Sequence, residues 1–202
     1  VNGSNCSENF RGRNAFVDTV VLPTTGTYTI RVNGIYAGIG TATVSLYDVP
    51  PVLTGTLTIG GPPVTITATA PGQDAEMTFT GTTGQRISMK VSGTLPEFSN
   101  VDILTPNGQL LNGIVGRIKQ LGSVRAEIIE TVALPVTGTY RVRINTFNDS
   151  GSMTFNLYEV PPDVNDGTIS IGGPPVTVTS TAERQNRRLT FEGTAGQVIN
   201  LK

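Results

Sequence analysis

Gly60-Gly61-Pro62-Pro63-Val64-Thr65 is the stretch that decides how this chain is organised, because it occurs twice. It returns 112 residues later as Gly172-Gly173-Pro174-Pro175-Val176-Thr177. Around it, residues 55–90 align with residues 167–202 without a gap, and 21 of the 36 aligned positions are identical. A duplication of this length predicts two copies of one structural unit.

A second duplication lies between these copies. Residues 134–140 (LPVTGTY) repeat the pattern of residues 22–28 (LPTTGTY), and residues 157–162 (LYEVPP) repeat that of residues 46–51 (LYDVPP). Only residues 52–162 hold the whole pattern, so we expect a complete unit there. Residues 1–51 are then the C-terminal half of one unit, and residues 163–202 are the N-terminal half of the next.

The composition favours β-structure throughout. The 202 residues include 24 Gly, 13 Pro and 30 Thr; Thr favours strands, while Gly and Pro mark turns. Tyr28, Ile30 and Val32 alternate with polar residues, as in a half-buried antiparallel strand. Turn signals recur about every 8–12 residues, which predicts an antiparallel β-sandwich of about eight or nine strands per unit.

Charge and cysteine content exclude several classes of protein. The net charge is -1 and only 14% of the residues are charged, whereas a nucleic-acid surface needs clustered Lys and Arg. No apolar run approaches the roughly 18 residues of a membrane-spanning helix, so we expect no membrane insertion. Cys6 is the only cysteine, so it can form no internal disulfide; it is either a free thiol, which is favoured, or pairs with a cysteine of another chain.

The motifs LPxTGTY, LY(D/E)VPP and FxGTxGQ resemble tandem repeats of about 110 residues in large secreted bacterial proteins. Those repeats are similar to the bacterial pre-peptidase C-terminal domain. The resemblance covers nearly the whole chain and implies a jelly-roll-like β-sandwich and an extracellular or cell-surface location. It implies no single function, because such modules serve as spacers, adhesive units and glycan- or calcium-binding appendages.

The expected fold class is therefore all-β: tandem antiparallel β-sandwiches of the jelly-roll or immunoglobulin-like type, with incomplete half-domains at both termini. Within this fold, Tyr28 and Tyr140 are candidates for a tyrosine corner. In that motif the ring is buried and the hydroxyl is bonded to the backbone a few residues upstream.

An enzymatic role has little support in the sequence. The chain contains no His, which removes the usual Ser-His and Cys-His nucleophile pairs. Asp48 and Glu159 recur at matching positions and are the best candidates for paired acid–base carboxylates. Each stands alone in its unit beside Pro-Pro, so a capping or turn role is favoured. We expect a protein that is not an enzyme and needs no cofactor.

One acidic loop has the oxygen-rich spacing of a calcium site. Its candidate ligands are Asp163, Asn165 and Asp166. The equivalent stretch in the other copy, residues 51–55, carries no acid, and three residues fall short of the six to eight oxygen ligands that calcium takes. A turn is therefore the favoured interpretation.

A basic cluster that the other copy lacks lies nearby and consists of Arg184, Arg187 and Arg188. These residues are either an interface feature or a solvated face.

Covalent glycans are the remaining possibility for chemistry on the surface. Asn2, Asn5 and Asn148 each begin an N-glycosylation sequon in a predicted loop. The sequon is short and its residues are common in turns, so chance explains the three occurrences equally well.

The boundaries of the repeats are the informative feature for function. A half sandwich leaves an apolar face and strand edges without partners. The expected assembly surfaces are an apolar set in the C-terminal half-unit packing on another set in the N-terminal half-unit. The first set is Val176, Val178, Leu189, Phe191, Ile199 and Leu201; the second is Tyr28, Ile30, Val32, Val44 and Leu46.

Two arrangements satisfy these surfaces. In one, the C-terminal half of a chain packs on the N-terminal half of the next and gives a head-to-tail polymer. In the other, the sequence is a window of a longer array and adjacent repeats of the same chain pair. Both lead to a structural segment of an extracellular fibre or stalk. The alternative function is a glycan- or calcium-binding module of a secreted enzyme or adhesin.

Overall fold

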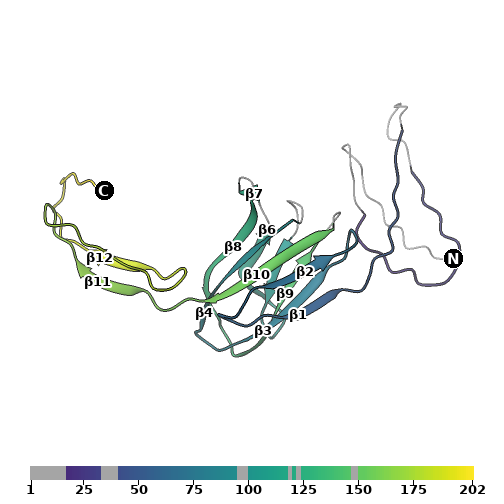
Figure 1. Ribbon diagram of the computed structural model, residues 1–202, viewed down its shortest axis with the longest axis horizontal. Coiled ribbons are helices and arrows are strands. Elements are labelled where there is room, and N and C mark those ends of the chain that lie inside the picture. Colours follow the sequence, from purple (N-terminus) through teal and green to yellow (C-terminus); the bar gives the residue numbers. More distant parts are fainter. Residues whose placement is uncertain (1–16, 33–40, 95–99, 118–119, 122–123, 147–149) are drawn as a thin grey trace.

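A computed structural model describes residues 17–32, 41–94, 100–117, 120–121, 124–146 and 150–202. It contains strands and no helix among these residues, which confirms the all-β class. The first ten strands form one sandwich (Figure 1). They are β1 (Leu53–Thr56), β2 (Val64–Ala68), β3 (Ala75–Gly81), β4 (Arg86–Gly93), β5 (Asn100–Leu104), β6 (Leu110–Arg117), β7 (Gln120–Leu121), β8 (Val124–Ala133), β9 (Gly138–Asn145) and β10 (Gly151–Glu159).

These strands make two five-stranded sheets, with the orders β1-β3-β9-β5-β6 and β2-β10-β4-β8-β7. Every pairing is antiparallel except that of β1 with β3, which is parallel. β3 and β9 lie at the centre of the first sheet, and β10 and β4 at the centre of the second. Each of these two pairs combines one strand from the first half of residues 52–162 with one from the second half, so neither half can complete a sheet without the other.

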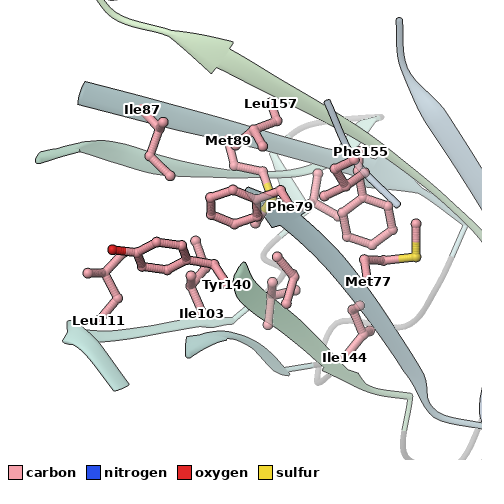
Figure 2. Packing of buried hydrophobic residues seen from close by; sticks show 14 of the residues in the cluster. Met77, Phe79, Ile87, Met89, Ile103, Leu111, Tyr140, Ile144, Phe155 and Leu157 are labelled. Carbon is pink, nitrogen blue, oxygen red and sulfur yellow. The ribbon is translucent and has the colours of Figure 1, made fainter. Parts of the chain in front are cut away.

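The core lies between the two sheets and is built by alternation along the strands (Figure 2). In β3, Met77 and Phe79 are buried while Thr80 is exposed. The ring of Phe79 stacks on that of Tyr140 in β9, with the ring centroids 5.1 Å apart and the planes 10° from parallel. Such a pair adds about 0.5–1.5 kcal/mol beyond the area that it buries. The pair also joins the two halves of residues 52–162 by direct packing, because Phe79 belongs to the first half and Tyr140 to the second.

The predicted tyrosine-corner hydrogen bond is present in both copies. The Tyr140 hydroxyl donates to the carbonyl oxygen of Val136 over 2.6 Å, and the Tyr28 hydroxyl donates to that of Thr24 over 2.6 Å. The burial differs: Tyr140 is 0% exposed and Tyr28 is 47% exposed. The corner is thus a local structure that forms without the surrounding sandwich, whereas burial of the ring needs the sandwich.

Two further strands, β11 (Val164–Thr168) and β12 (Arg187–Thr190), form a separate parallel pair beyond the sandwich. They repeat the pairing of β1 with β3, because Thr168 lies opposite Thr190 as Thr56 lies opposite Thr78. The backbone bonds repeat as well. The turn bond from Gly61 N to Thr58 O (3.0 Å) has its counterpart from Gly173 N to Ser170 O (3.0 Å).

The expected strand over residues 28–32 is not formed. Residues 17–32 and 41–52 contain no strand, and the predicted inward residues Tyr28, Ile30 and Val32 are exposed. The physical reason is the missing neighbours. The counterpart strand, β9, is held by ladders to β3 on one side and β5 on the other, and an extended segment without a ladder leaves its backbone groups to water. The division of the chain at residues 51/52 and 162/163 stays a prediction.

Candidate assembly surface

The predicted assembly residues of the C-terminal segment (residues 163–202) are exposed or half-buried. Phe191 is 50% exposed, whereas its counterpart Phe79 is 1% exposed. Leu189 is half-buried and its counterpart Met77 is fully buried. The other exposed members are Val176, Val178, Ile199 and Leu201. The same residue positions that fill the sandwich core in residues 52–162 therefore face solvent here.

The N-terminal segment (residues 1–51) has the complementary exposed set. Its described members Tyr28, Ile30, Val32, Val44 and Leu46 are all exposed. The residues that stand in their places in the complete unit (residues 52–162) are all buried; they are Tyr140, Val142, Ile144, Phe155 and Leu157. These apolar side chains are thus exposed at positions whose counterparts form a core, which makes them a candidate interaction surface.

The two sets do not meet within the chain. The N-terminal segment lies at one end of the sandwich, and the β11–β12 pair extends from the opposite end (Figure 1). The expected contact between them is therefore not made inside one molecule.

A shallow depression lies within the N-terminal set. It is lined by Leu22, Pro23, Thr24, Thr25, Gly26 and Tyr28. In the complete unit the equivalent residues hold the turn between β3 and β4. There Gly84 N donates to Leu134 O (2.8 Å) and Leu134 N donates to Gln85 O (2.9 Å). The depression thus corresponds in position to the residues that hold the β3–β4 turn in the complete unit.

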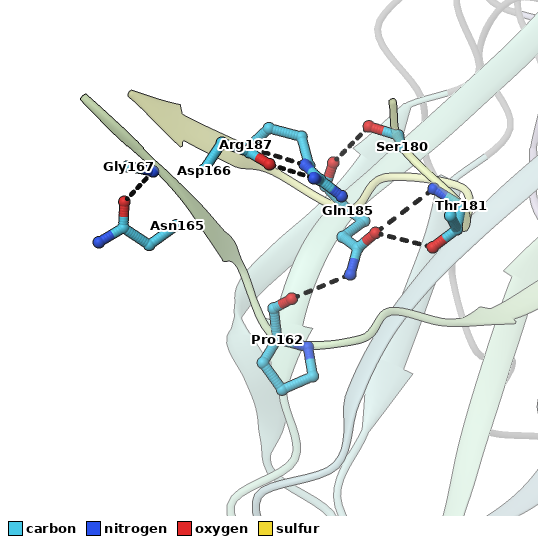
Figure 3. A network of polar contacts seen from close by, with 8 residues as sticks. All are labelled: Pro162, Asn165, Asp166, Gly167, Ser180, Thr181, Gln185 and Arg187. Carbon is cyan, nitrogen blue, oxygen red and sulfur yellow. Dashed lines mark hydrogen bonds and ion pairs between the residues drawn. The ribbon is translucent and has the colours of Figure 1, made fainter. Parts of the chain in front are cut away.

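The acidic loop predicted as a possible calcium site is committed to other partners (Figure 3). Asp166 forms a two-pronged ion pair with Arg187, and its Oδ2 accepts from Nε over 2.8 Å. Asn165 Oδ1 accepts from the Gly167 N–H over 3.0 Å. The described residues contain no group of three or more His, Cys, Asp or Glu side chains that would hold a metal ion. The favoured turn interpretation was wrong for Asn165 and Asp166, because both lie in strand β11, where Asp166 pairs with Arg187 of the neighbouring strand.

Asp166 is also an insertion relative to the first copy. Residues 53–54 correspond to 164–165, whereas residues 55–90 correspond to 167–202, so one residue is added between them. The β11–β12 register shifts at this point, between Asn165 and Thr168.

Arg187, the partner of Asp166, stands where the complete unit has the buried Ala75. The hydrogen bond between them lowers the pKa of Asp166 and raises that of Arg187, which keeps both groups charged.

Asp163 lies at the junction between the complete unit and the C-terminal segment. This junction, called the joint below, consists of the contacts of Asp163 with Arg86 and Asn186 and of Arg184 with Glu130. Its Oδ1 lies 2.8 Å from Arg86 Nη1, which also donates to the Pro161 carbonyl over 3.3 Å. Asn186 donates to the same carboxylate over 3.3 Å. The hydrogen bond from Arg86 lowers the pKa of Asp163. A second ion pair, Arg184 to Glu130 at 3.1 Å, ties the two parts together.

Arg184 has a left-handed backbone conformation, with φ of 62°, at the position that Gly72 occupies in the first copy. This conformation costs a non-glycine residue on the order of 1 kcal/mol. Sequence reasoning singled out Arg184 and Arg187 through the basic cluster. It missed Arg86 and Glu130, whose partners lie far along the chain.

The joint gives a pH-dependent prediction. Because the folded pKa of Asp163 is lowered, its contribution is fully present above the usual carboxyl value of 3.8 and is lost as the pH falls through the lowered value. Replacing Arg86 by Gln should raise the Asp163 pKa toward 3.8, as followed by NMR titration of the carboxyl carbon. Arg188→Gln is the matched control, because Arg188 acts on Asp163 only through its charge and is the smallest of the causes. An unchanged pKa in Arg86→Gln would contradict the role of this pair.

The remaining predicted site residues are not brought together. Glu159 accepts a hydrogen bond from Gln85 Nε2 over 3.1 Å, while Asp48 lies in the N-terminal segment, so the two carboxylates form no catalytic pair. Asn2, Asn5, Cys6 and Asn148 lie outside the described residues. Among the described residues there is no helix long and apolar enough to cross a membrane.

Comparison with known proteins adds distant structural neighbours. No protein-family model matches the chain, and no curated protein matches it in sequence. The pre-peptidase C-terminal domain of a collagenase from Bacillus anthracis is similar at a TM-score of 0.41 and 10% identity, over 54% of this chain and 97% of that one. PliG from Aeromonas hydrophila, a periplasmic inhibitor of g-type lysozyme, is similar at a TM-score of 0.36 and 15% identity, over 53% of this chain and 97% of that one. The sequence motifs indicated a resemblance to the first of these domains; both likenesses are distant and concern one β-sandwich, not a tandem array.

Proposed function

We propose that this chain is a non-enzymatic structural module of an extracellular or cell-surface fibre or stalk. In this proposal the C-terminal segment of one molecule packs on the N-terminal segment of the next and completes a sandwich between them. The extracellular location follows from the resemblance of the sequence motifs to repeats of secreted proteins. The module binds its own kind, so it needs no cofactor.

The observation that carries the proposal is a difference in burial at equivalent positions. Phe79 and Tyr140 are buried against each other, while their counterparts Phe191 and Tyr28 are each about half exposed. Covering an apolar side chain of this size stabilises by roughly 1.5–3 kcal/mol. Most of these roughly ten side chains are already about half covered, so burying the rest offers a gross gain of roughly 8–15 kcal/mol, of the same order as the 4–15 kcal/mol that association costs.

The geometry favours a linear assembly. The two exposed sets lie at opposite ends of the complete unit (Figure 1). A contact between unlike surfaces that does not close into a ring generates a filament. Each added molecule would bring one complete sandwich and one shared sandwich.

A calcium-binding module is the less well supported alternative. Asp163 and Asp166 are each neutralised by an Arg side chain, and a metal ion would have to displace both. Calcium competes poorly for carboxylates that already have a full charge partner within hydrogen-bond distance.

Sedimentation velocity over a range of concentrations tests the proposal, with negative-stain electron microscopy of the same samples. We expect species that grow with concentration beyond the 21.3 kDa monomer and that form unbranched strings of equal beads. A single sedimenting monomer at every concentration would overturn the proposal. Thermal unfolding with and without calcium accompanies the series, and a calcium-dependent stabilisation in that monomer would favour the alternative.

A further inference from the structure

Resting on the proposed function, we infer the identity of the partner and the register of the contact: residues 187–193 of one copy, which include β12, lie antiparallel to residues 26–32 of a second copy of this chain, with Phe191 opposite Tyr28. The complete unit supplies the template, because the same two halves meet there. Residues 1–32 correspond to positions 112 higher, and residues 41–52 to positions 111 higher.

The β3–β9 ladder translates into a well-matched core contact. Phe79 lies opposite Tyr140 in that ladder, and the equivalent pair is Phe191 with Tyr28, which keeps both aromatic rings. Two positions earlier along β3, Met77 lies opposite Val142. The equivalent pair is Leu189 with Ile30, so an apolar contact is again replaced by an apolar contact of similar volume.

The close approach at the end of the ladder is also preserved. Gly81 lies opposite Gly138, and a Cβ atom at Gly81 would fall 2.1 Å from Leu134 Cδ1. The equivalent residues are Gly193, Gly26 and Leu22. All three residue types are kept, so the same tight packing is available between two copies.

The β2–β10 pairing carries a ladder of hydroxyl groups. Thr65 and Thr154 share a hydrogen bond of 2.8 Å, and Thr67 and Ser152 share another of 2.8 Å. The equivalent residues in two copies are Thr177 with Thr43, and Thr179 with Thr41. Every member of the translated ladder is a hydroxyl residue.

The backbone hydrogen bonds that surround, in the complete unit, the equivalent of the depression at residues 22–28 can all be formed between two copies, because the donors and acceptors are kept. Gly84, Gln85 and Leu134 exchange two bonds in the complete unit. Their counterparts are Gly196, Gln197 and Leu22, which are the same residue types. The side-chain bond from Gln85 to Glu159 likewise becomes a bond from Gln197 to Asp48, so a carboxylate remains in place.

The joint provides an independent indication that the halves belong together. In the complete unit, Arg86 pairs with Asp163 of the segment that follows. The residue at the position of Arg86 in the C-terminal segment is Val198, and the residue at the position of Asp163 is Val52. Both members of an ion pair have been replaced by valine, and both valines are exposed. A sandwich shared by two copies places these two valines at the positions of the ion pair and leaves no unpaired charge there.

The partner is inferred to be a second copy of this chain. The two segments lie at opposite ends of the complete unit (Figure 1), so the C-terminal segment cannot reach residues 26–32 of its own chain without passing the whole sandwich.

Disulfide trapping in a Cys6→Ser background tests the register. Thr190 and Thr29 are equivalent to Thr78 and Arg141, which lie directly opposite each other. A chain carrying Thr190→Cys and Thr29→Cys should form, on mild oxidation, a ladder of covalent multimers on a non-reducing gel, removed by reductant. The matched control carries Thr190→Cys and Thr27→Cys. That pair is one diagonal step away, at about 7–8 Å between Cα atoms, which is beyond the reach of a disulfide.

The outcomes separate the register from the assembly itself. The inferred register is supported if the 190/29 pair gives at least ten times as much covalent multimer on the gel as the 190/27 pair. Assemblies in sedimentation combined with equal ladders, or with a stronger 190/27 ladder, would overturn the register while the proposed fibre stands. A monomer in sedimentation that gives no ladder would overturn both.

Discussion

Replacing Phe191 by alanine is expected to abolish head-to-tail assembly and to leave the melting temperature of the complete unit unchanged. Phe191 is half exposed in the isolated molecule, so its removal costs the monomer little. In the shared sandwich it would occupy the core position of Phe79. Removing a core Phe costs about 3–5 kcal/mol, which corresponds to a loss of more than about 100-fold in the association constant.

Phe79→Ala is the matched variant for this prediction, because it makes the same change at the equivalent position of the complete unit. There the loss of about 3–5 kcal/mol falls on the folding of the monomer, and the fully buried ring leaves a cavity against Tyr140. Thermal unfolding and sedimentation are measured on both variants. Phe191→Ala chains that assemble as well as the parent chain would show that the exposed ring is not an interface residue.

The sequence predicted the complete unit well because its signals are local. The alternation of Met77 and Phe79 in β3, and of Met153 and Phe155 in β10, needs only the two-residue period of a strand with one buried face. The duplication also identified which positions are core. Those predictions depend on neighbours in sequence, and the structure confirms them through burial of each side chain.

Predictions at the ends of the chain were less accurate for a physical reason. Tyr28 forms its hydroxyl bond to Thr24 in the absence of a sandwich, because that bond spans four residues. A strand at residues 28–32 needs ladder partners from elsewhere, and among the described residues no strand pairs with it. Under the proposed assembly, the alternating pattern describes the structure that this segment would take when paired with a second copy.

The acidic loop illustrates what spacing cannot reveal. Asp163 and Asp166 stand close together in sequence, as calcium ligands do, but they face different arginines. Arg86, the partner of Asp163, lies in β4 and becomes its neighbour only after the sandwich has folded. Arg187 was visible beforehand as part of a basic cluster. Its pairing with an inserted residue depends on the parallel register of β11 with β12.

One position of the inferred register is unfavourable, and its repair is the second major prediction. In the complete unit Glu76 lies opposite Arg143. The equivalent pair between two copies is Arg188 with Arg31, and like charges directly opposite each other on a sheet are destabilising. Arg188→Glu should therefore strengthen assembly, because it recreates a Glu–Arg pair at this position.

The expected gain is on the order of 2- to 30-fold in the association constant, because the change removes a repulsion and adds an attraction, each of roughly 0.2–1 kcal/mol. Sedimentation equilibrium at low salt measures it. Added salt should strengthen assembly of the parent chain by screening the repulsion and should weaken that of the Arg188→Glu chain.

A double-mutant cycle makes this prediction specific to the register. Arg31→Glu alone should give the same gain as Arg188→Glu, whereas the chain with both changes restores like charges and should lose the gain. An effect of Arg188→Glu that persists in the double variant would come from net charge alone. Assembly through some other register would then be indicated, because only the alignment of Phe191 with Tyr28 places residues 188 and 31 opposite each other.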